Sequence, residues 1–185
     1  MSLPLWIQFP WLNPGRVQLH QRLSYHRGHP IPVMPSMEAA GRLIAPMSYA
    51  TERGLDWWGH PSFVQFNLDL YGIKGSRGDC DTTAMWLAAV ALKCAEVDAV
   101  RIGAAFWMGN DGKQHGHAVC CYRVPGEGWN WQSPWKGCAP VRGQWLMGMR
   151  TNWEPFGRLL KAVSWRATLA DQDTIKLDSP EESVV

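Results

Sequence analysis

Thiol-dependent acyl transfer needs three kinds of side chain, and the sequence offers candidates for each: Cys80, His117, and either Asn130 or Gln132. Such chemistry uses a thiolate nucleophile, a histidine that takes and returns its proton, and a third group that orients the imidazole. Cys80 opens a stretch rich in Ala, Leu and Met, so we expect it in the first turn of a helix. Unpaired N–H groups and the helix dipole favour a thiolate there and can hold an oxyanion.

His117 lies in the second of three predicted strands, and the third strand supplies two candidates for the orienting group. Asn130 and Gln132 project from one face of that strand, because side chains alternate along it. If the strands are antiparallel neighbours, a carbonyl oxygen of either residue can accept the Nδ1–H of His117. Both residues therefore stand as candidates.

The elements that position these residues form a helix followed by an antiparallel meander. Asp79 is the expected N-cap of a helix that runs from Cys80 to about Ala95. Strands are predicted over 99–107, 115–124 and 129–132, with turns at 110–112 and 125–128. This order predicts an α+β fold in which the helix that carries the nucleophilic cysteine packs on the meander.

The flanking segments suggest three parts: an N-terminal arm over 1–35, a domain over 36–168 and an acidic tail over 169–185. The arm holds six prolines and is predicted to be extended, wrapped around the body or a partner, or irregular on the domain's own surface. Ser36 is the expected cap of a short helix, and another helix is predicted near 156–163. The tail holds five acidic residues and is predicted to be mobile or bound to a partner.

Composition excludes several classes of protein. With 185 residues, a net charge of +2 and 18% charged residues, the chain gives no electrostatic case for nucleic-acid binding. It has no apolar run long enough for a membrane span. The first residues lack a basic region and are interrupted by Pro4 and Pro10, so no secretion signal is expected. The odd count of five cysteines indicates reduced thiols, in the cytoplasm or within a larger assembly such as a virion.

A metal site is a weaker interpretation of the same residues. His115 and His117 share a strand face and could bind a metal with Cys80, Cys121 or Cys138. Neither Cys-x-x-Cys nor His-Glu-x-x-His spacing occurs, so we predict no metal and no cofactor. Cys94 and one of the adjacent residues Cys120 and Cys121 are expected in the core, and His20, His26 and His29 in solvated loops.

Three segments together resemble the core of the transglutaminase-like cysteine peptidase superfamily. They are Arg-Gly-Asp-Cys-Asp-Thr-Thr-Ala (77–84), Gly-His-Ala-Val (116–119) and Gly-Trp-Asn-Trp-Gln-Ser-Pro (128–134), and the resemblance covers about residues 75–135. It implies a papain/transglutaminase-like core with Cys80 as nucleophile and His117 as base. The family's third residue is an Asp at the end of the next strand. It falls on Gln132 or Ser133 here, with Asn130 as a papain-like substitute.

The resemblance implies a thiol hydrolase, a cysteine peptidase or amidase that acts on a peptide or amide substrate through Cys80 and His117. With an amine as acceptor, the same acyl transfer would cross-link proteins. The alternative is a non-catalytic structural or assembly protein with the same fold, such as a viral or phage tail component. The missing Asp, the proline-rich arm, the 12 tryptophans and the acidic tail favour that alternative. Arm and tail would then bind protein partners.

Overall fold

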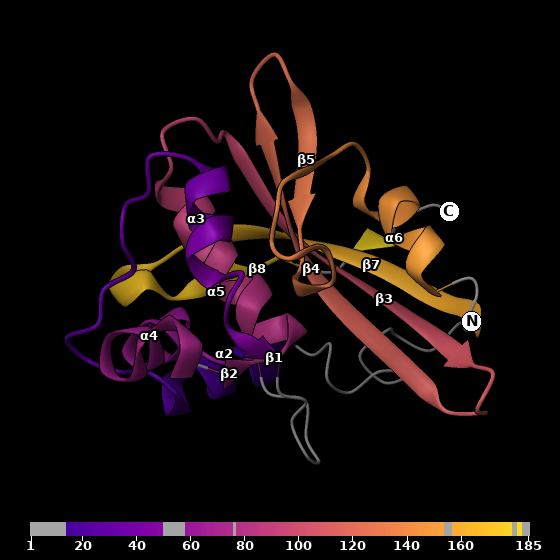
Figure 1. Ribbon diagram of the computed structural model, residues 1–185, viewed down its shortest axis with the longest axis horizontal. Helices are drawn as coiled ribbons and strands as arrows, with labels where there is room; N and C mark the ends of the chain where they lie inside the picture. The colour runs from indigo at the N-terminus through magenta and orange to yellow at the C-terminus, as the bar shows by residue number, and fades with distance from the viewer. Residues whose placement is uncertain (1–13, 50–57, 76, 154–156, 179–180, 183–185) are drawn as a thin grey trace.

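In the computed structural model, residues 14–49, 58–75, 77–153, 157–178 and 181–182 are described. The N-terminal half is mainly helical, with α2 (Pro14–Leu23), α3 (Met37–Ile44), α4 (Pro61–Gly75) and α5 (Cys80–Lys93). Two short strands, β1 (Ser48–Tyr49) and β2 (Arg77–Gly78), pair in parallel beside them. Figure 1 shows these helices gathered at one end of the molecule and α6 (Trp145–Trp153) at the other.

The second half forms an antiparallel sheet, so the predicted α+β fold is confirmed. Its strands are β3 (Ala99–Gly109), β4 (Gln114–Val124), β5 (Gly128–Gln132), β6 (Val141–Arg142), β7 (Gly157–Leu169), β8 (Ile175–Leu177) and β9 (Glu181–Glu182). The spatial order is β6-β5-β4-β3-β7-β8, and β9 also pairs with β7. The predicted meander is β3, β4 and β5, and both predicted turns lie between them.

Helix α5 begins at Cys80, as the sequence predicts. Asp79 is its N-cap, with its Oδ1 accepting a hydrogen bond from Thr82 N–H at 3.2 Å. The Asp79 N–H donates in turn to Thr82 Oγ1 at 3.1 Å, which completes a capping box. Residues 81–91 are all buried, because α3, α4 and the sheet surround the helix. The start of α5 is therefore fixed both by its cap and by tertiary packing.

The two faces of the sheet carry separate apolar clusters, which we name by the helix on each. On the α5 face, alternate residues of β3 and β4 such as Ala104, Ala118 and Cys120 join the cluster that contains α5. On the α6 face, the residues between them, such as Ala105 and Cys121, join a cluster with α6. Adjacent strand residues point to opposite faces, so both clusters are consequences of the period of two.

The expectation of an extended N-terminal segment is wrong for residues 14–23, which form α2. Its residues Val17, His20 and Gln21 are buried, so His20 is not a solvated loop residue. The Gln21 side chain donates to Ile175 O at 2.7 Å and accepts from Ile175 N–H at 2.8 Å. These two hydrogen bonds join α2 to β8, although the residues are far apart in the sequence. Residues 1–13 lie outside the described part of the chain.

The C-terminal third also differs from the prediction. Residues 157–169 form strand β7 rather than a helix near 156–163, because pairing with β3 on one side decides their conformation. The predicted mobile tail contributes β8 and β9 to the other side of β7, and Ile175 is fully buried. Ser36 caps α3, as predicted, by accepting from Ala39 N–H at 3.2 Å. None of the helices in the described residues is long and apolar enough to cross a membrane.

Candidate functional site

Cys80 is the first residue of α5 and is half-buried, whereas the other four cysteines are buried. Burial raises the pKa of the Cys94 and Cys120 thiols, and that of Cys138 to about 11. These buried thiols behave as small apolar side chains. Cys120 and Cys121 lie on opposite faces and both are buried, whereas the sequence pattern predicted only one of them in the core. Cys80 is the cysteine with solvent access.

His117 lies in strand β4, and its side chain is buried, with only 2% of the residue exposed. Its Nε2 is 2.6 Å from Ser133 Oγ, so the hydroxyl that follows β5 is the partner of the imidazole. Burial lowers the pKa of His117 to about 3, because a charged imidazolium would lose its hydration there. The ring is therefore neutral at physiological pH.

The register of the sheet places His117 on the α6 face. His117 is directly opposite Ala105 of β3, and residues directly opposite each other share a face. Ala105 belongs to the α6-face cluster, whereas Cys80 packs against the α5-face cluster. The structure therefore does not bring Cys80 and His117 together on one face of the sheet.

Gln132 and Asn130 lie on the α5 face, because they are directly opposite Cys120 and Tyr122 of β4. Gln132 is fully buried, and its Nε2 donates to Met37 O at 2.8 Å and to Cys138 O at 2.7 Å. This amide connects the start of α3 to the loop after β5. Neither predicted orienting residue shares the face of His117.

Ser133 is the residue that takes the orienting position beside His117. It is fully buried and directly follows β5, where the resemblance places either Gln132 or Ser133. The signal in the sequence is the Ser-Pro pair directly after the strand. Side chains alternate along a strand, so Ser133 takes the face opposite that of Gln132. A hydroxyl is neutral, so it stabilises an imidazolium less than a carboxylate would.

Comparisons of the chain with protein-family models, curated proteins and solved structures gave no match. The described residues also hold no group of three or more His, Cys, Asp or Glu side chains that could bind a metal ion.

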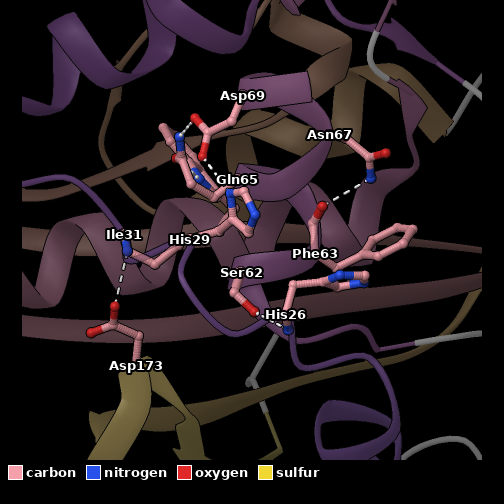
Figure 2. A network of polar contacts seen from close by, with 10 residues as sticks. His26, His29, Ile31, Ser62, Phe63, Gln65, Asn67, Asp69 and Asp173 are labelled. Atoms are coloured by element: carbon pink, nitrogen blue, oxygen red, sulfur yellow. Dashed lines mark hydrogen bonds and ion pairs between the residues drawn. The ribbon is translucent and has the colours of Figure 1, made fainter. Parts of the chain in front are cut away.

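A second polar cluster lies between the loop after α2 and helix α4 (Figure 2). His29 Nδ1 is 2.7 Å from Asp69 Oδ2, and Gln65 Nε2 donates to Asp69 Oδ1 at 2.7 Å. His26 stacks on Phe66 with ring centroids 4.3 Å apart. A cavity of about 300 Å³ is lined by His26 and His29 of this cluster, with Asp173 also in its wall. The sequence pattern indicated only solvated loop residues at these histidines.

His60, directly before α4, has a structural role. Its Nδ1 accepts a hydrogen bond from Ser62 N–H at 3.0 Å and lies 2.8 Å from Ser62 Oγ, so it caps the start of α4. Its Nε2 is 3.3 Å from Thr174 Oγ1, next to β8. Burial lowers the pKa of His60 to about 4. A neutral His60 thus joins α4 to the C-terminal segment.

Proposed function

We propose that this chain is a structural or assembly protein whose transglutaminase-like order of residues does not catalyse thiol hydrolysis. The observation that carries the proposal is the position of His117. It is buried on the α6 face of the sheet, whereas Cys80 packs against the apolar cluster that contains α5. A base that serves a thiol must reach it within hydrogen-bond distance, directly or through one water.

The electrostatic surroundings support the same conclusion. The low pKa of His117, about 3, keeps the imidazole neutral where catalysis would require it to accept a proton from the thiol. Asp79 and Asp81 flank Cys80 in the sequence, and both are buried. Ionised carboxylates close to a thiol disfavour the thiolate, so these neighbours do not favour an activated Cys80.

Exposed apolar side chains support a role in assembly. Leu19 and Leu23 project from α2, and Leu70 and Tyr71 from α4, each with more than half of its surface exposed. Figure 1 places α2 and α4 at the same end of the molecule. Exposed large apolar side chains of this kind are available for contacts with another protein.

Thiol labelling tests this proposal. Iodoacetamide should label Cys80 at pH 7 no faster than it labels a small model thiol, and His117→Gln should leave the rate unchanged. His29→Gln is the matched control, because it makes the same change at a histidine in contact with solvent. The proposal is overturned if Cys80 reacts more than about tenfold faster than the model thiol and loses this advantage in His117→Gln alone.

The second candidate function is acyl transfer through Cys80, as a thiol hydrolase or a cross-linking acyltransferase. It is favoured by the half-buried position of this cysteine at a capped helix start. A peptide vinyl sulfone, followed by intact-mass measurement, tests it. An adduct that is absent from Cys80→Ala supports this candidate, and incorporation of a fluorescent primary amine into a protein acceptor would identify the transferase form. If no adduct forms, the assembly role is the better explanation.

A further inference from the structure

A cavity of about 280 Å³ lies on the α6 face, between strands β3–β5 and the first turn of α6. Its lining combines a cation, two tryptophans and an amide: Arg101, Trp129, Trp145 and Gln144, with Cys121 also in the wall. This size is close to the lower end of small-molecule sites, and apolar walls with a few polar groups are typical of them. The cavity is lined by neither Cys80 nor His117, so it can be tested independently of the proposed function.

Arg101 already binds a carboxylate. Its Nη1 is 2.5 Å from Glu181 Oε2 and donates to Ser164 Oγ at 3.1 Å. Glu181 comes from the short strand β9, and its side chain is 63% exposed. Arg166, directly opposite Arg101 on β7, adds a second cationic side chain to the region. Arg101 lines the cavity and its guanidinium binds a carboxylate from β9, so this side chain indicates the chemistry that a ligand would use there.

Gln144 adds a neutral polar side chain to the same wall. It directly precedes α6, lines the cavity and is exposed, so its amide is in contact with solvent. An amide N–H can donate to a carboxylate oxygen without adding charge. Asn130 also borders the cavity, but the register places its side chain on the α5 face, so Gln144 is the amide that a ligand on the α6 face would meet.

The two tryptophans supply flat apolar walls, and the position of Trp145 is fixed by a glycine. A Cβ at Gly103 would lie 2.7 Å from Trp145 Cε2, so only the bare backbone of β3 allows the indole to lie against it. Both indoles are half-buried. Aromatic rings stack on indoles in offset or edge-to-face geometry, so a ligand with a planar ring fits these walls.

We propose that this cavity binds a small aromatic carboxylate, with its carboxylate on Arg101 and Gln144 and its ring against Trp129 and Trp145. Glu181 competes with the ligand for Arg101. The exposed Glu181 can withdraw at little cost because its ion pair is at the surface, and a ligand held also by the cavity walls replaces it.

Isothermal titration calorimetry with benzoate tests the proposal, with benzamide and acetate as probes that lack the charge or the ring. Benzoate should bind more tightly than either. Glu181→Gln should tighten benzoate binding by about threefold to tenfold, because Arg101 loses its internal partner. Glu127→Gln is the matched control: it removes the same charge from an exposed Glu–Arg pair outside the cavity and should leave binding unchanged.

Arg101→Met should weaken benzoate binding by about tenfold or more without changing benzamide binding. Circular dichroism establishes whether Arg101→Met is folded. If it is not folded, Glu181→Gln still tests the proposal, because it changes only one exposed side chain. The proposal is overturned if benzoate fails to bind both the wild type and Glu181→Gln at about 10 mM, roughly the weakest affinity that matters for a small ligand. It is equally overturned if Glu181→Gln and Glu127→Gln bind benzoate with the same affinity.

Discussion

His117 and His29 show how differently the same side chain is held in two regions of this protein. His117 is enclosed by the sheet, contacts a neutral hydroxyl and has a pKa lowered to about 3 by burial. His29 lies near the surface, and its partner is the carboxylate of Asp69, which Gln65 also holds. Location in a predicted motif therefore does not make a histidine available for proton transfer. Solvent access and the charge of the partner decide it.

The largest expected effect is on stability in acid. The pKa of His117 is about 3 and that of His60 about 4 in the folded protein, and both are near 6.5 when unfolded, so the unfolded state binds more protons below pH 6.5. Stability should be full above pH 6.5 and fall by about 1.4 kcal/mol per pH unit for each histidine as the pH decreases towards the folded pKa values.

Urea unfolding between pH 7 and 5 measures this slope. His117→Gln should lower the slope by about 1.4 kcal/mol per pH unit, and His60→Gln should do the same, because each change removes one group that takes up a proton on unfolding. An unchanged slope in His117→Gln would show that this imidazole is not buried in neutral form, and the contrast with His29 would fail.

The next effect concerns the hydroxyl beside His117. Ser133→Ala should lower the free energy of unfolding by about 1 to 3 kcal/mol, because it leaves a buried imidazole nitrogen without its hydrogen bond. Ser164→Ala is the matched control on the same face of the sheet. Its partner Arg101 is 31% exposed and can turn to water, so the loss there should be below about 1 kcal/mol. Equal losses would contradict the special environment of Ser133.

The smallest effect is expected at the exposed pair. Asp69→Asn should change the free energy of unfolding by no more than about 1 kcal/mol, because both side chains of the His29–Asp69 pair are in contact with solvent. Glu38→Gln, at the exposed i,i+4 pair with Arg42 on α3, should give a change of similar size. A loss of several kcal/mol in Asp69→Asn alone would show that this region contributes as much to the free energy of unfolding as the buried part of the sheet does.

The features that the sequence predicted correctly are local ones. The cap at Asp79, the start of α5 at Cys80 and the turns between β3, β4 and β5 all depend on residues close together in the chain. Glycine, asparagine and aspartate at the turns and an aspartate at the cap carry direct physical preferences. Short-range chemistry was therefore sufficient for the meander and its helix.

The features that it missed depend on partners far away in the chain. The period of two places His117 and Ala118 on opposite faces, but it does not say which face α5 covers. Residues 157–169 include apolar residues at spacings that suit a helix, and only their pairing with β3 makes them a strand. For the same reason Ser133 was less evident than Gln132: the choice between them depends on the face that His117 occupies.

The paired hydrogen bonds of Gln21 with Ile175 have a consequence for how the protein meets other copies of itself. β8 is the last strand in the order of the sheet, and such a strand offers its main chain to any other strand that approaches. The Gln21 amide makes the two hydrogen bonds that a neighbouring strand would make, and α2 brings it there. A side chain of α2 thus occupies the outward main-chain groups of Ile175, so a strand of another copy cannot pair with them at this position.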